Sequence, residues 1–262
     1  GESMVVRLLS TGPDRRSLAD LGMAPDTLAA YRAALDKGWG MIVVTGPTGA
    51  GKTTTLYATL ATLAGPTRTA VSVEDPVERR LPFVRQSQVN RRAGFTFPVG
   101  IKHALRQDPD ILMVGEIRDA ETARAAAQGA LTGHLTLTSL HTGDAAGAID
   151  RLVDLGVERY QIAAIFRGAL AQRLVRAFCV SCGGKGCPRC HGEGYRGRIG
   201  LFEFLPADDE LREMIRNGAP ASALREKAAR IEGYVSLADD GRRKVADGIT
   251  DTVELVRGLH GL

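Results

Sequence analysis

The stretch GPTGAGKT, residues 46–53, joins an apolar run to a helical pattern, and the interpretation of the chain starts from it. It matches G-x-x-x-x-G-K-[ST] at every fixed position, directly after MIVVT and at the start of TTTLYATLATL. The glycines of such a loop let backbone N–H groups surround a phosphate, and the helix N-terminus adds a favourable dipole. We therefore expect a P-loop that binds a nucleoside triphosphate, with Lys52 on the β- and γ-phosphates and the Thr53 hydroxyl on Mg²⁺. The expected nucleotide-binding residues are Gly46, Pro47, Thr48, Gly49, Ala50, Gly51, Lys52, Thr53 and Thr54.

Short apolar runs alternate with helical patterns around this loop. The runs are MIVVT (41–45), AVSVE (70–74), ILMVG (111–115) and LTLTSL (135–140). Apolar strands that alternate with helices form parallel sheets covered on both faces, so we expect an α/β fold with a mostly parallel central sheet. Two short helices are expected before it, over residues 17–37. One or two strands at RIGLFEFL and three or four charged amphipathic helices are expected after it, and we find no internal repeat.

Acidic and histidine side chains stand at the ends of these strands. Glu74 and Asp75 end the second run, Glu116 follows the third, and His141 follows the fourth, which His134 precedes. In an open α/β sheet the ligand lies beyond the carboxyl ends of the strands, so we expect the acidic groups and His141 near the γ-phosphate. Hydrolysis needs a carboxylate to orient water, a second to hold Mg²⁺ through its hydration shell, and a polar group that senses the γ-phosphate.

All four cysteines lie in CVSCGGKGCPRC, residues 179–190, as two Cys-x-x-Cys pairs. A disulfide framework needs more cysteines in a chain of this length, and a thioredoxin-like redox pair needs one Cys-x-x-Cys at the start of a helix. Four thiolates suit tetrahedral Zn²⁺ in a closed structural site, and His191 is a less favoured alternative ligand. The expected zinc ligands are Cys179, Cys182, Cys187 and Cys190.

Composition limits the remaining possibilities. The chain has 262 residues, of which 44% are hydrophobic, enough for one large domain or a domain with an appendage. It shows no signal-peptide pattern and no apolar run of about 18 residues, so we expect a cytoplasmic protein. The chain begins at Gly1 within what reads as a strand, which suggests a fragment.

The stretch between Glu78 and Asp108 contains no acidic residue. It is interpreted as a solvated basic face, as a surface for a polyanion, or as a set of arginines presented to phosphates across a subunit boundary. Its basic residues are Arg79, Arg80, Arg85, Arg91, Arg92, Lys102 and Arg106.

Four segments carry a resemblance to a known family. GPTGAGKTTTLYATL, VSVEDPVE, LRQDPDILMVGEIRDAETA and LTGHLTLTSLHTGDA resemble, in order, the Walker A, aspartate, Walker B and histidine boxes of the secretion ATPase superfamily. GYRGRIGLFEFL, preceded by the cysteine pairs, narrows the resemblance to the type II secretion and type IV pilus assembly ATPases, the GspE/PilB group. The resemblance runs from Val5 to the C-terminus.

This resemblance implies a role for each matching residue. Glu116 becomes the catalytic carboxylate, and Arg106 matches a basic position that family members direct toward nucleotide within a ring. Glu74 and Asp75 become the aspartate-box acids, and His134 and His141 the histidine-box sensors.

The resemblance also implies a domain organisation. Residues 1–16 are expected to end an N-terminal PAS-like lobe and 17–176 to form a RecA-like P-loop ATPase domain. Residues 177–200 are expected to form a tetracysteine zinc module and 201–262 a C-terminal helical subdomain. Two departures from the family pattern are visible: Gly38-Trp39-Gly40 replaces Pro-His-Gly, and the spacer between the cysteine pairs is short.

The implied protein is a homohexameric ATPase, peripheral to the inner membrane, with ATP, Mg²⁺ and Zn²⁺ as cofactors. Its hydrolysis powers assembly of a type II secretion pseudopilus or a type IV pilus, and its partners are an inner-membrane platform protein and a cytoplasmic recruitment protein. A retraction-type pilus motor is one alternative. A nucleic-acid translocating P-loop ATPase is another, but a nucleic-acid partner is not expected because aromatic residues make up 5% of the chain.

Overall fold

The computed structural model describes Met4 and residues 17–260. The expected end of an N-terminal lobe at residues 1–16 therefore lies, apart from Met4, outside the described residues. No helix within the described part of the chain is long and apolar enough to cross a membrane.

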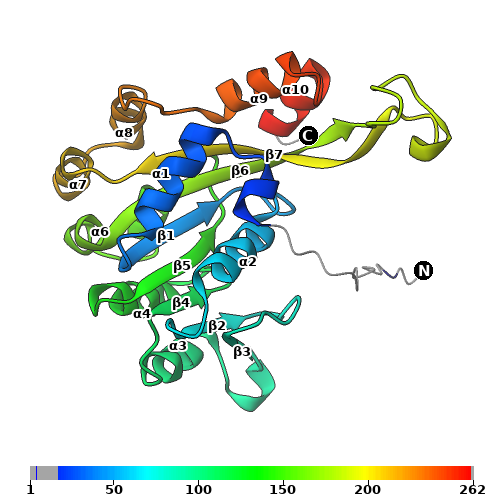
Figure 1. Cartoon of the computed structure of the whole chain (residues 1–262). Helices are drawn as coiled ribbons and strands as arrows, with labels where there is room; N and C mark the ends of the chain where they lie inside the picture. The colour runs from blue at the N-terminus through cyan, green and yellow to red at the C-terminus, as the bar shows by residue number, and fades with distance from the viewer. Residues whose placement is uncertain (1–3, 5–16, 261–262) are drawn as a thin grey trace.

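A seven-stranded sheet forms the centre of the described molecule, in the order β3-β2-β4-β5-β1-β6-β7 (Figure 1). All neighbouring pairs are parallel except β6 and β7, which are antiparallel. The mostly parallel α/β fold is therefore confirmed. The strands are β1 (Gly40–Thr45), β2 (Ala70–Glu74), β3 (Val84–Gln88), β4 (Ile111–Val114), β5 (Leu135–Leu140), β6 (Phe166–Phe178) and β7 (Tyr195–Pro206).

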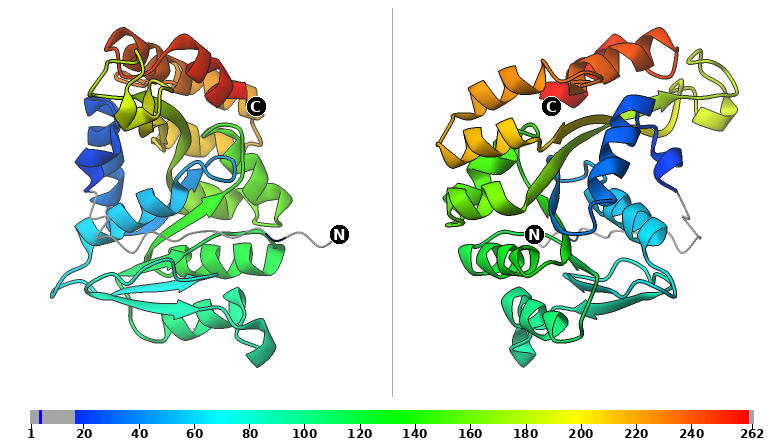
Figure 2. Two further views of the ribbon diagram at one scale, coloured as in Figure 1. Left: turned by 90° about the vertical axis from the view of Figure 1, so that its right-hand side faces the viewer. Right: turned by 60° about the vertical axis from the view of Figure 1, so that its left-hand side comes forward.

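Helices cover both faces of this sheet (Figure 2). One apolar core joins η1, α1 and α2 to one face, and a second joins α3 to α6 and the later helices to the other. The elements before the cysteines are η1 (Leu18–Leu21), α1 (Pro25–Leu35), α2 (Lys52–Leu63), η2 (Arg91–Ala93), α3 (Phe97–Leu105), α4 (Ala120–Leu131), α5 (Gly147–Asp154) and α6 (Arg159–Ile165). Those after the first cysteine are η3 (Pro188–Cys190), α7 (Asp209–Arg216), α8 (Ala221–Ala228), α9 (Leu237–Ala246) and α10 (Thr252–His260).

The four apolar runs form β1, β2, β4 and β5 as predicted, and every residue of these strands is buried. Two strands were not predicted. β3 has the half-exposed polar sequence VRQSQ, and β6 carries Arg167, Gln172 and Arg173 within an otherwise apolar strand. Both lack the continuous apolar run that marks a buried parallel strand.

β6 and β7 are longer than the other strands and extend beyond them as a two-stranded stem. The stem carries the cysteine-rich turn at its tip, seen as the arm at the right of Figure 1. We call residues 179–194 the cysteine hairpin. The predicted domain boundaries near 176 and 200 fall inside β6 and β7, so the division into domains remains a prediction.

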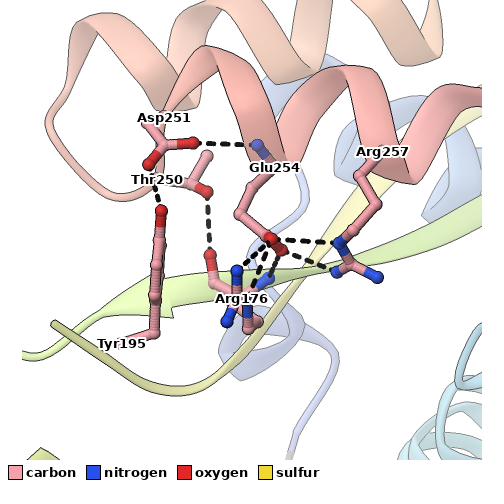
Figure 3. Close-up of polar contacts among 6 residues, drawn as sticks. All are labelled: Arg176, Tyr195, Thr250, Asp251, Glu254 and Arg257. Carbon is pink, nitrogen blue, oxygen red and sulfur yellow. Dashed lines mark hydrogen bonds and ion pairs between the residues drawn. The ribbon is translucent and has the colours of Figure 1, made fainter. Parts of the chain in front are cut away.

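The last helix, α10, is fixed to this stem by a buried carboxylate (Figure 3). Glu254 is fully buried and accepts hydrogen bonds from the backbone N–H and the Nε of Arg176, each at 2.9 Å, and from Arg257 at 2.6 Å. Burial raises the pKa of Glu254, but the bonds from Arg257 and Arg176 outweigh burial and bring the pKa to about 2. Beside it, the Tyr195 hydroxyl donates to Asp251. α10 therefore lies on the base of the cysteine hairpin.

Candidate nucleotide site and cysteine cluster

The P-loop, residues 46–53, leaves the carboxyl end of β1 and enters α2 at Lys52. Gly51 is the N-cap of α2 in the left-handed conformation (φ 87°), and a Cβ added there would lie 2.7 Å from Gln172 Nε2. A Cβ added at Gly46 would lie 2.4 Å from the Gln172 carbonyl oxygen. The loop thus lies directly against β6, and side chains at these two positions would collide with that strand.

The Lys52 ammonium is folded into this loop. Its Nζ donates to the carbonyl oxygens of Gly46 at 2.8 Å and Pro47 at 2.9 Å. Burial lowers the pKa of Lys52 to about 8, although the charge of nearby Glu116 opposes the shift. Two carbonyl dipoles compensate a buried cation weakly, so a phosphate at this position is a better partner for Lys52.

Glu116 and His141 meet at the carboxyl edge of the sheet. Glu116 follows β4 and His141 follows β5, and the His141 Nε2 lies 3.8 Å from a carboxylate oxygen of Glu116, longer than a direct hydrogen bond. The other Glu116 oxygen lies 2.7 Å from Arg118. Burial, and then the charge of Lys52, lower the pKa of His141, so a neutral imidazole faces this carboxylate at neutral pH. The structure thus brings Lys52, Glu116 and His141 together.

Glu74 lies at the same edge but is enclosed in protein. It is buried, and its carboxylate accepts hydrogen bonds from the Tyr57 hydroxyl, from Ser72 Oγ at 2.5 Å and from Gln86 Nε2 at 3.1 Å. The next residue, Asp75, is exposed and lies 3.5 Å from Arg91. Of the two predicted aspartate-box acids, Asp75 is the one that solvent or a ligand reaches.

His134 and Arg106 lie at the edge of the sheet opposite the P-loop, as the position of His134 before its strand indicates. His134 precedes β5, and its Nδ1 contacts the Gly129 carbonyl oxygen at 2.9 Å. A six-residue strand separates it from His141, a length of about 20 Å at roughly 3.3 Å per residue. Arg106 caps the end of α3, before β4, and is exposed at the same far edge.

The loop that carries His141 is fastened by residues that sequence reasoning missed. The Arg173 guanidinium of β6 donates to the Gly143 carbonyl oxygen. Glu203 of β7 accepts from the Ala145 N–H at 3.2 Å, and Arg225 of α8 pairs with Asp144 at 2.5 Å. Charged residues inside the apolar strands β6 and β7 were the available signal. Residues from the C-terminal half of the chain therefore directly contact the loop that follows His141.

The four cysteines converge at the tip of the stem. They are not joined by disulfides, and their Sγ atoms all lie within 4.8 Å of one another. The distances are 3.9 Å between Cys179 and Cys187, 3.8 Å between Cys182 and Cys190, and 3.7 Å between Cys187 and Cys190. Tetrahedral zinc with bonds of about 2.3 Å places sulfurs about 3.8 Å apart, so the donor set fits this ion.

The cysteine hairpin is a tandem repeat of an eight-residue unit, which corrects the expectation that the chain has no internal repeat. CVSCGGKG (179–186) and CPRCHGEG (187–194) share the pattern C-x-x-C-x-G-x-G. Both units contain the same turn: Cys182 N–H bonds the Cys179 oxygen and Cys190 N–H bonds the Cys187 oxygen, each at 3.1 Å.

The glycines of the two units interlock. A Cβ at Gly186 would lie 2.7 Å from the Gly192 oxygen, and a Cβ at Gly194 would lie 2.4 Å from the Gly184 oxygen. These are equivalent contacts, made once from each unit to the other. The short spacer is therefore part of the first repeat, and the two repeats together supply the four-sulfur cluster.

Comparison with known proteins identifies relatives over nearly the whole chain. The family model described as "Type II/IV secretion system protein" matches residues 1–257. Type II secretion system protein HxcR of Pseudomonas aeruginosa is 49% identical over 98% of this chain and 56% of its own length. The type IV pilus assembly ATPase PilB of Thermus thermophilus is 42% identical over 98% of this chain and 32% of its own length. The chain thus spans about half or less of the length of these relatives.

A solved structure has the same fold. The pilus retraction motor PilT, crystallised with bound ADP, superimposes with a TM-score of 0.75 at 26% identity, covering 95% of this chain and 68% of PilT.

Proposed function

The chain belongs to the type II/IV secretion system protein family, and from this premise we propose that it is the ATP-hydrolysing part of a secretion or pilus assembly motor. Its reaction is the hydrolysis of ATP to ADP and phosphate. Lys52 and Thr53 hold the phosphates and Mg²⁺, Glu116 orients the attacking water, and His141 senses the γ-phosphate.

One observation carries this proposal. Lys52 lies in a loop shaped for a phosphate, while Glu116 and His141 lie 3.8 Å apart at the same sheet edge. A phosphate-binding lysine beside a carboxylate that can orient water and a neutral imidazole suits phosphoryl transfer to water. The resemblance to ADP-bound PilT supports the choice of nucleotide.

The direct experiment compares the Mg²⁺-dependent ATPase activity of the wild type with that of Lys52→Ala. We expect the variant to bind ATP more weakly and to lose turnover, because the buried ammonium that faces the phosphates is gone. Glu226→Gln, an exposed change on α8, serves as the control and should retain wild-type activity. Wild-type turnover in Lys52→Ala would overturn the proposed function.

An assembly motor is favoured over a retraction motor by the relatives. The chain is 42–49% identical to proteins named for type II secretion or pilus assembly, but 26% identical to the retraction motor PilT. The proposed partners are an inner-membrane platform protein and a recruitment protein, with the motor on the cytoplasmic side as a homohexamer. In such a ring Arg106, which is exposed at the edge opposite its own P-loop, would face a neighbouring subunit's nucleotide.

The proposed cofactor of the cysteine hairpin is Zn²⁺, held by Cys179, Cys182, Cys187 and Cys190. When bound, the ion supplies structural cross-links between the two repeats. Four sulfur ligands leave no open position for water, so no catalytic role is proposed for it.

A further inference from the structure

Tyr57 stands where the P-loop helix meets the loop that follows β2. It lies one turn into α2, and its side chain is 2% exposed. Its hydroxyl donates to Glu74 and accepts a hydrogen bond from the Glu78 N–H at 3.1 Å. Burial, and then the bond to Glu74, raise the pKa of Tyr57, so the hydroxyl keeps its proton and remains a donor. One side chain of α2 thus bonds both the residue that precedes the next segment and a residue in the middle of it.

This segment, residues 75–83, we call the aspartate-box loop. Besides Tyr57, two glutamines of β3 hold it: Gln86 accepts from the Leu81 N–H at 2.7 Å, and Gln88 accepts from the Val77 N–H at 3.1 Å. At its start, Asp75 also lies 3.5 Å from the exposed Arg91. The Arg79 guanidinium lies over the Tyr57 ring, 5.3 Å from its centroid. Tyr57 is the group that connects this loop to the P-loop helix.

Glu74 is buried, and both of its carboxylate oxygens already accept hydrogen bonds from protein groups. One of its oxygens accepts from Ser72 and Gln86, and the other accepts from Tyr57. With these bonds made and the side chain buried, the carboxylate serves as the anchor for the Tyr57 hydroxyl. The exposed carboxylate beyond it, Asp75, is the one whose position this anchoring sets.

We propose that Tyr57 and Glu74 are positioning residues, which hold the aspartate-box loop and its Asp75 in register with the P-loop helix. The inference rests on the proposed function, because it assigns the loop a place beside bound Mg²⁺-ATP. Glu74 was expected to act on the bound ligand as an aspartate-box acid. In this proposal Glu74 instead acts indirectly, through Tyr57 and Asp75.

The test is Tyr57→Phe, which removes the hydroxyl and keeps the ring under Arg79. We expect kcat to fall on the order of 10- to 100-fold, since small misplacements of reacting groups cost that much, while the KM for ATP stays within about twofold. Hydrogen exchange at the amides of Val77, Glu78 and Leu81 should become faster.

The matched control is Tyr31→Phe. Tyr31 is also fully buried, and its hydroxyl contacts Thr59 of the same helix at 2.9 Å, on the side away from the aspartate-box loop. Its removal should lower thermal stability about as much as Tyr57→Phe does, yet leave kcat at the wild-type value. If both variants lost the same amount of kcat, the effect of Tyr57→Phe would be explained by general destabilisation of the fold. That result would overturn the proposal.

Glu74→Gln separates positioning from direct action on the metal. If Glu74 acts through Tyr57, Glu74→Gln should lower kcat about as much as Tyr57→Phe and speed up exchange at the same loop amides. Wild-type kcat in Tyr57→Phe, or a loss of kcat in Glu74→Gln with unchanged loop exchange, contradicts the proposal. An inactive wild type would instead contradict the proposed function, and in that case the exchange rates of the aspartate-box loop still decide whether Tyr57 holds it.

Discussion

At the scale of single residues, the pKa of Lys52 predicts how nucleotide binding depends on pH. The apo protein holds this pKa near 8, and a polyphosphate raises it again because the anion favours the charged ammonium. Binding above pH 8 must therefore take up a proton, and affinity should fall by up to about tenfold per pH unit there. Calorimetry in two buffers of different ionisation enthalpy measures this uptake. We expect it at pH 8.5 and much less of it at pH 7, whereas equal uptake at both would contradict the assignment.

Strand ends explain which site residues were predictable. Glu116 and His141 each follow a fully buried strand, so their convergence followed from the rule that parallel strands end at one edge. The same rule places His134 at the opposite edge, since it precedes its strand. Glu74 was placed correctly, but its enclosure was not predictable, because Tyr57 and Gln86 reach it from other elements.

At the scale of elements, the cysteine hairpin and α10 should depend on each other. A Cβ at Gly184 would lie 3.0 Å from the Phe178 ring, this ring stacks on Tyr195 with centroids 5.4 Å apart, and Tyr195 bonds Asp251 next to α10. Disorder at the hairpin therefore removes packing from the residues that hold α10.

We predict that removing the proposed zinc ion with a chelator loosens α10. Hydrogen exchange of its amides should accelerate by at least about tenfold, since losing one charge-assisted hydrogen bond costs about 1.5–3 kcal/mol, while exchange in α2 should not change. Glu254→Gln should loosen α10 yet keep one zinc per chain, because the cysteines are untouched. Unchanged α10 exchange after complete zinc loss would show that the two elements are independent.

The element scale also explains the errors in the predicted sheet. β3 is the edge strand of the sheet and pairs only with β2. It is half exposed and carries the polar residues Arg85, Gln86 and Gln88, so its sequence lacks the apolar run that predicts a strand. The apolar sequence of β6 is interrupted by Gln172 and Arg173. Gln172 lies against the P-loop and accepts from Thr55 of α2, and Arg173 donates to the loop after β5. Polar residues are stable in these strands because of tertiary contacts, which cannot be predicted from the local sequence pattern.

At the scale of the whole molecule, the position of Arg106 predicts cooperation between subunits. It is exposed at the edge opposite the P-loop, so in the proposed ring it would act on a neighbour's nucleotide. We expect specific ATPase activity to rise with protein concentration.

We also expect Arg106→Ala to bind ATP normally and lose about 10³-fold in turnover, the size of effect known for arginines supplied in trans. Arg243→Ala, an exposed change on α9, should behave as the wild type, and activity independent of concentration would argue against a ring.

The central claim is that Glu116 performs hydrolysis at a site where Lys52 binds the phosphates. The most direct measurement is a single-turnover assay of Glu116→Gln, in which the same sample is assayed for bound ATP and for released phosphate. The substitution keeps the size of the side chain and removes its charge, so we predict wild-type ATP affinity with phosphate release reduced by at least about 10²-fold. Phosphate release at the wild-type rate would contradict the account, since the carboxylate beside His141 would then have no part in the reaction.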